Sequence, residues 1–329
     1  MTRVRVGLLG AAKIAPPAVI KPAAQRSDCE VVAVASRDRA RGEAFAAEHG
    51  IAAIETDYEA LVRRDDIDLV YNGLPPSRHK DLSIAALEAG KPVLCEKPFA
   101  MNAAEARAMV EAAGRADRPL IEAFHYRFHP VFQRVMEILS VGALGEVSAI
   151  SATFTVAIPY RKGELRHTAA LGGGALMDLG CYPLHWVRTV AGCEPDVISA
   201  VAHEKRPGVD VAMEADLAFP SGVSAKVSCS MARGAPFAAL LKVTGAEASL
   251  TVVNPIAPHF GHEIRLTRDG ETQSETVDGM TTYDHQLAHV IDVLGGRAAP
   301  ITGGADAVAN MAAVDAMYRA AGMKPRGEA

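Results

Sequence analysis

The chain has 329 residues, of which 49% are hydrophobic and 22% are charged, and its formal net charge is -5. This length suffices for two domains with substantial cores, and the composition is that of an ordinary globular protein. The slight negative charge argues against nucleic acid or an anionic membrane surface as a partner. No apolar run approaches the roughly 20 residues that a membrane-spanning helix needs.

The five cysteines are scattered, odd in number, and without a C-x-x-C pair. We therefore expect neither a disulfide framework nor a metal site, but buried thiols in a reducing compartment. The N-terminal residues enter a strand pattern at once, so we expect no signal peptide and a cytoplasmic protein.

Strands and helices alternate over the first 124 residues, which predicts a parallel, doubly wound sheet in an α/β domain over 1–124. Each expected strand is a short apolar or alternating run, and a helical pattern follows it. The expected strands are 3–9, 30–36, 52–54, 67–72, 91–95 and 119–124. The expected helices are one that begins near Pro16, then 39–49, 57–64, 78–89 and 102–117.

The pattern changes after Pro130. Successive strands with hairpin signals fill 197–277, which predicts a mostly antiparallel sheet in an α+β domain over 125–303. Around this sheet we expect helix 130–140, strand 145–158, an irregular stretch 159–171, a helix from the glycine run to Ala191, and helices 282–294 and 304–321. The segment 304–329 is expected to pack back on the first domain, and the tail after Gly322 looks loose.

The turn after the first strand has the spacing of a dinucleotide-binding site. Gly10-x-Ala12-x-x-Ala15 stands in the place of G-x-G-x-x-G/A, whose small residues let backbone approach a pyrophosphate at a helix N-terminus. Alone the match is weak, and an ordinary strand–helix turn is equally plausible. The surrounding alternation favours a cofactor site that includes Gly10, Ala12, Lys13 and Ile14.

The end of the second strand distinguishes the nicotinamide cofactors. An NAD site typically has a carboxylate there, whereas a phosphorylated ribose calls for an arginine. The chain has Ser36-Arg37-Asp38, so we expect NADP, with NAD as the alternative. The competing interpretation makes Arg37 a solvated residue at a helix start and Asp38 an N-cap.

Two further segments are expected beside the cofactor, because each follows a strand near the switch point of the sheet. The loop after the fourth strand contains Leu74, Pro75 and His79, and the histidine either lines the nicotinamide pocket or packs against the loop at a helix start. The fifth strand ends in Glu96-Lys97-Pro98, which delivers charged groups to the edge where such sheets bind ligands.

A second group of titratable residues follows the glycine run 172–174. Asp178, Tyr182 and His185 are spaced i, i+4, i+7, which puts them within about 60° of one another on a helix unless Pro183 kinks it. Such a face indicates a site; the alternative is an aspartate favoured by the helix dipole and two packed aromatic rings.

Taken together, these motifs resemble the Gfo/Idh/MocA family, named for glucose-fructose oxidoreductase and inositol dehydrogenase, over nearly the whole chain. The resemblance rests on residues 7–15, Leu74-Pro75 with His79, Glu96-Lys97-Pro98, 122–130 and 172–182. The Ala-Ala-Lys-Ile-Ala turn and Asp-Leu-Gly-Cys-Tyr-Pro look most like the branch of dimeric dihydrodiol dehydrogenases and NADP-dependent xylose dehydrogenases.

The resemblance implies a Rossmann domain, then a domain whose large open sheet often forms a dimer interface, so we expect a homodimer or homotetramer. It implies hydride transfer between nicotinamide and a sugar, polyol or cyclic diol. The family's lysine, tyrosine and aspartate map onto Lys97, Tyr182 and Asp178, and the Lys97-Pro98 bond is expected to be cis. Further candidates, each with a structural alternative, are Glu96 and Arg127 for the cofactor and His125, Arg166 and His185 for the substrate.

The chain departs from the family pattern in loops that face the substrate. Pro76 and Arg78 replace the usual asparagine and aliphatic residue, and 159–171 lacks the common asparagine pattern, although Glu164-Leu165-Arg166 stands where an acid-aliphatic-arginine triplet is common. The substrate of a named relative is therefore not inherited.

These residues lead to a mechanistic hypothesis. A substrate hydroxyl needs a base as hydride leaves its carbon, and the pKa of a free tyrosine, near 10, is too high unless an ammonium group lowers it. We expect Tyr182 to be the general acid/base, Lys97 its activator, and Asp178 to orient the substrate or Lys97. The alternatives are glycoside cleavage with a retained NAD(P), and an NAD(P)-binding regulatory protein with a degraded site.

Overall fold

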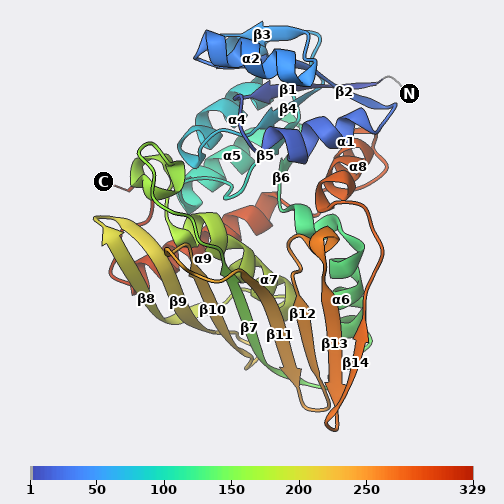
Figure 1. The fold of residues 1–329 in the computed structure, drawn as a ribbon, viewed down its shortest axis with the longest axis vertical. Helices are drawn as coiled ribbons and strands as arrows, with labels where there is room; N and C mark the ends of the chain where they lie inside the picture. The colour runs from blue at the N-terminus through green and yellow to red at the C-terminus, as the bar shows by residue number, and fades with distance from the viewer. Residues whose placement is uncertain (1–2, 329) are drawn as a thin grey trace. The chain divides into compact units, whose positions relative to one another are not determined.

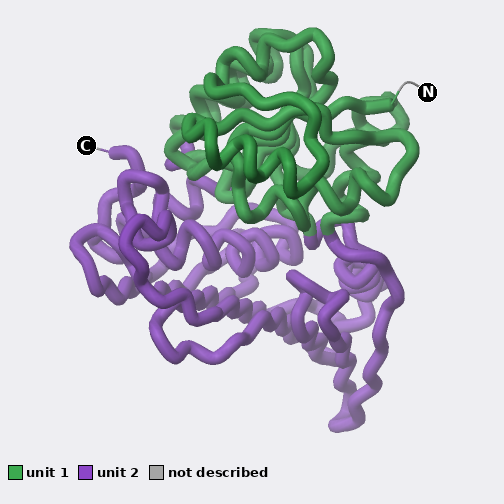
Figure 2. The backbone as a smooth tube through the Cα atoms, turned by 45° about the horizontal axis from the view of Figure 1, so that its top comes forward, with its two compact units in different colours: residues 1–100, 104–125, 283–308 green, residues 101–103, 126–282, 309–329 purple. Residues whose placement is uncertain are grey.

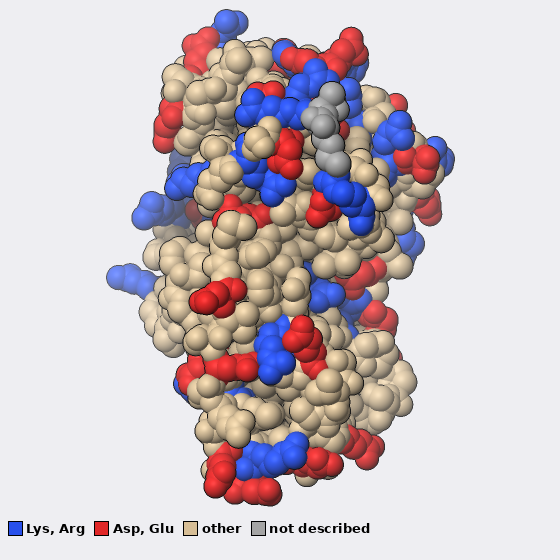
Figure 3. All heavy atoms as spheres, turned by 90° about the vertical axis from the view of Figure 1, so that its right-hand side faces the viewer, with Lys and Arg blue, Asp and Glu red and all other residues tan. Residues whose placement is uncertain are grey.

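The computed structural model describes residues 3–328, which divide into two compact units (Figure 2). Unit 1 contains residues 3–100, 104–125 and 283–308, and unit 2 contains 101–103, 126–282 and 309–328. Among the described residues, no helix is both long and apolar enough to cross a membrane. On the face drawn in Figure 3, acidic and basic side chains are interspersed, with no field of one sign.

Unit 1 is built on a six-stranded parallel sheet in the order β3-β2-β1-β4-β5-β6 (Figure 1). Its strands are β1 (Val4–Leu9), β2 (Cys29–Ala35), β3 (Ala53–Glu55), β4 (Leu69–Asn72), β5 (Val93–Cys95) and β6 (Leu120–Glu122). The connecting helices are η1 (Pro16–Ile20), α1 (Lys21–Ala24), α2 (Arg39–His49), α3 (Tyr58–Val62), η2 (Pro76–Arg78), α4 (His79–Glu88) and α5 (Ala103–Ala116). The predicted doubly wound sheet is confirmed. The strand order is that of a Rossmann fold: β2 and β3 lie on one side of β1, and β4, β5 and β6 lie on its other side.

The core of unit 1 includes a helix from late in the chain. Val6, Leu8 and Leu69 of the central strands are buried together with Leu287 and Val290 of α8 (Thr282–Leu294). The sequence interpretation assigned 282–294 to the second domain. The structure instead buries the apolar side chains of α8 against the parallel sheet, whose strands need cover on both faces.

Unit 2 is built on an eight-stranded sheet in the order β14-β13-β12-β11-β7-β10-β9-β8 (Figure 1). Its strands are β7 (Val147–Thr155), β8 (Asp196–Arg206), β9 (Val209–Ala218), β10 (Ser224–Ser230), β11 (Ala238–Gly245), β12 (Ser249–Val253), β13 (Glu263–Arg268) and β14 (Glu271–Glu275). Neighbouring strands are antiparallel except β7 and β10, so the predicted mostly antiparallel sheet is confirmed.

Helices cover one face of this sheet, and the strands alternate accordingly: Ile150, Ala152 and Phe154 of β7 are buried while Ser151 is exposed. The unit also contains α6 (Pro130–Ser140), the helix formed by η6 (Leu176–Gly180) and α7 (Cys181–Ala191), and most of α9 (Gly304–Ala320). The sequence interpretation packed 304–329 on the first domain. In the structure only the first turn of α9 groups with unit 1, because Tyr318 and Arg326 are buried in unit 2.

Both helices that follow the predicted functional turns begin with a π-helical segment. In η1 the amide of Lys21 donates to the Pro16 carbonyl, and in η6 the amide of Cys181 donates to the Leu176 carbonyl. A proline follows each segment, and the carbonyls four residues before Pro22 and Pro183 lie within it. A proline ring clashes with that carbonyl, so a wider turn relieves the clash without breaking the helix.

His79, the first residue of α4, lies between two loops of unit 1, and its neutral ring can donate a hydrogen bond to only one of them. Its Nδ1 lies 3.0 Å from the Pro98 carbonyl oxygen, and its Nε2 lies 2.7 Å from the Leu74 carbonyl oxygen. The ring is fully buried, and this burial lowers the pKa of His79 to about 4. The loop that it holds contains the Lys97-Pro98 bond, which is cis as expected.

We predict that His79 makes the fold less stable as the pH falls from about 6.5 to about 4. Over that range the histidine of the unfolded chain, with a pKa of 6.5, becomes protonated while the buried ring of the folded chain stays neutral. Proton binding therefore favours the unfolded state. The difference between the two pKa values corresponds to roughly 3 kcal/mol, present above pH 6.5 and lost by pH 4. Urea unfolding of the wild type and His79→Gln at pH 7 and pH 4 measures it. If the free energy of unfolding falls equally between pH 7 and pH 4 in the wild type and in His79→Gln, the prediction is contradicted.

Candidate functional site

The turn between β1 and η1 in unit 1 is shaped by Gly10. Its φ of +94° lies in the left-handed region, and a Cβ there would lie 2.8 Å from Cδ2 of Leu74. Its amide donates to the carbonyl oxygen of Ala35 (2.9 Å), which ties the turn to the end of β2. The expected cofactor residues Ala12, Lys13 and Ile14 complete this turn. The Leu74-Pro75 loop, which was expected beside the cofactor, therefore lies next to this turn.

The end of β2 carries the residues that were expected to select the cofactor. Ser36 is buried and donates from Oγ to the Asp38 carbonyl oxygen (2.8 Å), while Arg37 is exposed. Asp38 is the N-cap of α2, as the competing interpretation proposed, and accepts from the amide of Arg41 (3.1 Å). The N-cap hydrogen bond is made by the side chain of Asp38 and not by that of Arg37, so it does not exclude a role for Arg37.

Arg41 is a residue that the sequence analysis missed. Its Nη2 donates to the carbonyl oxygen of Ala11 (2.7 Å), so its guanidinium reaches from α2 onto the dinucleotide turn. The sequence offered no signal for this contact, because the acceptor, the Ala11 carbonyl, lies 30 residues away along the chain. This end of unit 1 fits NADP: a glycine turn opens a helix, and Ser36, Arg37 and Arg41 stand where an NAD site typically has a carboxylate.

Glu96 belongs to a buried polar network beside Lys97. It accepts a hydrogen bond from the hydroxyl of Tyr71 on β4 (2.7 Å) and one from the Lys97 amide (3.3 Å). Burial, followed by the charge of Glu96, raises the pKa of Tyr71 and of Tyr283, so both phenols stay protonated. The expected substrate residue His125 stacks on Tyr283 with ring centroids 4.3 Å apart. These contacts give Glu96 and His125 a structural role in unit 1.

His79 contributes no polar atom to a pocket, because both ring nitrogens face backbone carbonyl oxygens and the ring is buried. This favours the interpretation in which the histidine packs against the loop at a helix start. It orders the loops that carry Leu74 and Lys97 and acts on a cofactor only through them.

In unit 2, Asp178 is paired with Arg166. The Arg166 Nε lies 2.7 Å from Oδ2 of Asp178, and its Nη1 lies 3.0 Å from Oε1 of Glu164. The charge of Asp178 raises the pKa of Arg166. The acid-aliphatic-arginine triplet of the sequence is thus the segment that orients Asp178.

Tyr182 is held between two rings. It packs edge-on against Tyr126 and Phe154, with centroid separations of 6.2 and 5.8 Å. His185 is buried and shares a 2.5 Å hydrogen bond with the hydroxyl of Tyr126. The predicted common face of Asp178, Tyr182 and His185 stays a prediction: Asp178 pairs with Arg166, while Tyr182 and His185 both contact Tyr126. His185 supports Tyr126, and Tyr126 in turn packs on Tyr182.

Arg127, expected on the cofactor side, belongs to unit 2, and its guanidinium lies over the ring of Phe132 (5.2 Å). Lys97 belongs to unit 1, whereas Tyr182 and Asp178 belong to unit 2. That these three residues act together is a proposal.

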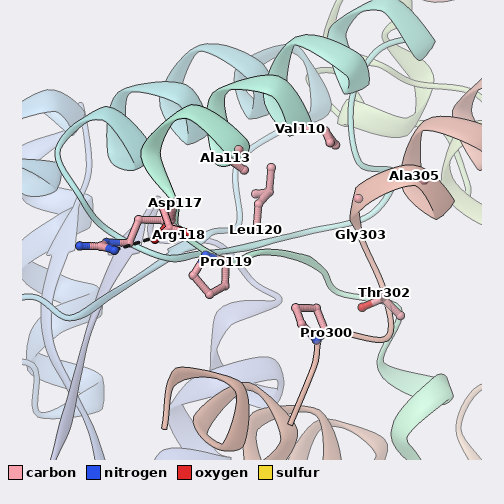
Figure 4. Close-up of a pocket in the computed structure, with 12 residues that line it drawn as sticks. Val110, Ala113, Asp117, Arg118, Pro119, Leu120, Pro300, Thr302, Gly303 and Ala305 are labelled. Carbon is pink, nitrogen blue, oxygen red and sulfur yellow. Dashed lines mark hydrogen bonds between the residues drawn. The ribbon is translucent and has the colours of Figure 1, made fainter. Parts of the chain in front are cut away.

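A cavity of about 600 Å³ in unit 1 lies away from these residues (Figure 4). It is lined by Ala113 of α5, by Arg118, by Leu120 and by the turn at Gly303. Leu120 begins β6, so this cavity is at the amino edge of the parallel sheet. Doubly wound sheets bind their ligands at the opposite, carboxyl edge, and none of the expected site residues lines the cavity.

Two family models match the chain. Residues 4–124 match the GFO_IDH_MocA model, described as an oxidoreductase family with an NAD-binding Rossmann fold, and residues 132–251 match the GFO/IDH/MocA C-terminal domain. The chain is 34% identical to D-xylose 1-dehydrogenase (NADP(+)) 2 of Haloferax volcanii over 96% of each chain. It is 35% identical to bovine (Bos taurus) trans-1,2-dihydrobenzene-1,2-diol dehydrogenase over 70% of this chain and 68% of the other.

Solved structures agree with these matches. A 3-ketoreductase from Actinomadura kijaniata, in complex with TDP-benzene and NADP, superposes with a TM-score of 0.89 at 27% identity, covering 97% of this chain and 98% of the other. An aldose-aldose oxidoreductase from Caulobacter crescentus gives 0.88 at 26% identity, covering 97% of each. With both domains matched and a relative similar over its whole length, the chain belongs to the GFO/IDH/MocA family of NAD(P)-dependent oxidoreductases.

Proposed function

We propose that the protein transfers hydride between NADP and a secondary alcohol or carbonyl group of a sugar, a polyol or a cyclic trans-diol. The observation that carries this proposal is the carboxyl edge of unit 1, where the glycine turn and the Ser36–Arg41 segment form an NADP-type site and Lys97 follows β5. Relatives named for D-xylose and for a trans-dihydrodiol support the substrate class. The scattered cysteines support a reducing, cytoplasmic setting.

In the proposed mechanism Tyr182 is the general acid/base. The bound nicotinamide accepts or supplies the hydride, and Tyr182 exchanges the proton of the substrate oxygen. Lys97 is proposed as the activator of Tyr182, because a neighbouring ammonium group favours the phenolate form of a tyrosine. Asp178, oriented by Arg166, receives a hydrogen bond from a substrate hydroxyl. The rings of Tyr126 and Phe154 limit the rotation of Tyr182, so the phenol is aimed before substrate binds.

The solved 3-ketoreductase structures lend support to this pair. They include a tyrosine-to-phenylalanine mutant and a lysine-to-alanine mutant, and the two mutated positions are separated along that chain by nearly the same distance as Lys97 and Tyr182 here.

A panel of sugars, inositols and trans-dihydrodiols, offered with NADP and with NAD, tests the proposed reaction through the absorbance of reduced nicotinamide. Turnover with a sugar or diol is the expected result. Release of an aglycone from a glycoside without net change in NADPH would instead favour redox-assisted glycoside cleavage. Tight NADP binding without turnover on any member of the panel would favour a regulatory protein.

We predict that Tyr182→Phe lowers kcat by about 10²- to 10⁴-fold, the usual contribution of a general acid/base. Its Kd for NADP should be unchanged, because the expected cofactor residues at the turn and at the end of β2 belong to unit 1. Tyr58→Phe, on α3, is the matched control and should keep its kcat. Near-normal turnover by Tyr182→Phe removes the assignment.

We predict that Arg37→Ala and Arg41→Ala each weaken NADP binding by roughly 10- to 100-fold, the value of a lost charged hydrogen bond. NAD binding should change little, because NAD lacks the ribose phosphate. Arg39→Ala is the control: Arg39 lies between them in sequence, and its guanidinium pairs with Glu43. Tighter binding of NAD than of NADP by the wild type contradicts the cofactor assignment.

We also propose a homodimer or homotetramer formed through the outer face of the eight-stranded sheet. Val201 of β8 and Leu240 of β11 are exposed and in register across that face, with Glu214, Ser228 and Thr153 between them. Exposed apolar side chains on such a face suit contact with a second copy. Ser228→Arg, at the middle of this row, should reduce the particle mass measured by light scattering to that of one chain. A wild type that is already monomeric at micromolar concentration refutes the proposal.

A further inference from the structure

A buried arginine close to the C-terminus contacts the segment from which the candidate substrate helix begins. Arg326 is only 4% exposed. Its Nε donates to the carbonyl oxygen of Gly173 (2.7 Å), and its Nη2 donates to Oδ1 of Asp210 (2.6 Å). The guanidinium lies over the ring of Tyr318 (4.3 Å). All of these residues belong to unit 2.

Asp210, on β9, is the partner that completes the contact. It is fully buried, and Oδ1 also accepts from the hydroxyl of Tyr318 (2.9 Å). Its other oxygen, Oδ2, accepts from the backbone amide of Leu176 (2.7 Å). Leu176 is the first residue of η6, two residues before Asp178. Arg326 and Asp210 thus hold the backbone at 173 and 176, directly before the residues proposed to do chemistry.

Gly174 shows how close this contact is. Its φ is +135°, and a Cβ there would lie 2.6 Å from Nη2 of Arg326 and 2.8 Å from the Tyr318 hydroxyl. On the other side, its amide donates to the Arg166 carbonyl oxygen (2.9 Å). The glycine run is therefore a narrow strip of backbone between the Arg326–Asp210 pair and the segment that orients Asp178.

The tail that carries Arg326 is itself fixed. Asn102 donates from Nδ2 to the carbonyl oxygen of Arg326 (2.8 Å), and Asp315 of α9 accepts from the amide of Ala103 (2.9 Å). The sequence predicted a loose tail after Gly322. In the structure, however, Met323, Pro325 and Arg326 are buried.

We propose that Arg326 and Asp210 are positioning residues for the reaction, which fix the backbone from which Asp178 and Tyr182 project. This inference rests on the proposed function. A buried ion pair is a costly way to stabilise a fold, and well-packed apolar side chains often do as well. Its value here is geometric, because the planar fork of an arginine fixes two oxygen atoms at once, and a displacement of about 1 Å at a reacting group can cost 10²-fold in rate.

Hydrogen exchange tests the positioning without a substrate. In Arg326→Lys, which keeps a cation but loses the fork, peptides covering 173–182 should exchange at least tenfold faster while those of the eight-stranded sheet are unchanged. Arg188→Lys is the matched control. Arg188 is equally buried in unit 2, and its guanidinium donates to Glu194 and Asn310. Unchanged exchange in Arg326→Lys, or the same change in Arg188→Lys, overturns the inference.

Kinetics then separate positioning from general stability, with D-xylose and trans-1,2-dihydrobenzene-1,2-diol as probes and NADP as cofactor. Arg326→Met should lower kcat by about 100-fold, with the Kd for NADP within twofold of the wild type, and Arg326→Lys should recover about tenfold of that loss. If Arg326→Met does not fold, a tenfold lower kcat in Arg326→Lys than in the wild type is the expected result. A kcat within twofold of the wild type in the folded Arg326 variants overturns the inference.

Tyr182→Phe, assayed beside these variants, distinguishes the two ways of failing. An inactive Tyr182→Phe together with fully active Arg326 variants removes only the positioning role. An active Tyr182→Phe removes the proposed function, and the positioning role with it.

Discussion

Each candidate functional segment depends on a glycine where another part of its own unit comes too close for a side chain. At Gly10 the neighbour is Leu74, so the turn after β1 and the loop after β4 meet with no side chain of residue 10 between them. At Gly174 the neighbours are Asp210, Arg326 and Tyr318, so side chains hold the backbone that precedes η6. In both places the glycine lets two segments approach more closely than a side chain would allow.

A proline then determines the geometry of the first turns of the helix that follows each glycine. Pro22 and Pro183 each force the carbonyl four residues earlier out of the α-helical pattern, and the chain responds with a π-helical turn rather than a kink. In the substrate helix this turn contains Asp178. Asp178 pairs with Arg166, while Tyr182 packs against the rings of Tyr126 and Phe154.

Features determined by short chain segments could be predicted from the sequence. The six parallel strands and the placing of Gly10 each follow from a few adjacent residues, whereas the cis Lys97-Pro98 bond was expected from the resemblance to the family. Features that depend on a distant partner could not. Arg41 was missed because its acceptor is the Ala11 carbonyl, and a helical projection of His185 cannot show that Tyr126 lies within hydrogen-bonding distance. The predicted domain assignments of α8 and α9 were wrong for the same reason, since the sequence of an apolar helix face does not indicate which sheet it packs against.

Glu96 and Asp210 show why buried acids here act through position rather than through proton transfer. Glu96 accepts from Tyr71 and from the Lys97 amide, and Asp210 accepts from Arg326, Tyr318 and the Leu176 amide. Burial raises the pKa of Asp210, while its donors oppose that shift by favouring the carboxylate. A carboxylate whose oxygens are occupied by fixed donors has little capacity to accept a substrate proton. It can, however, hold a backbone amide in place, and in each unit that amide is within two residues of a group proposed to meet the substrate, Lys97 in one and Asp178 in the other. Lys97 and Asp178 therefore each lie close to a buried acid that holds the nearby backbone in place.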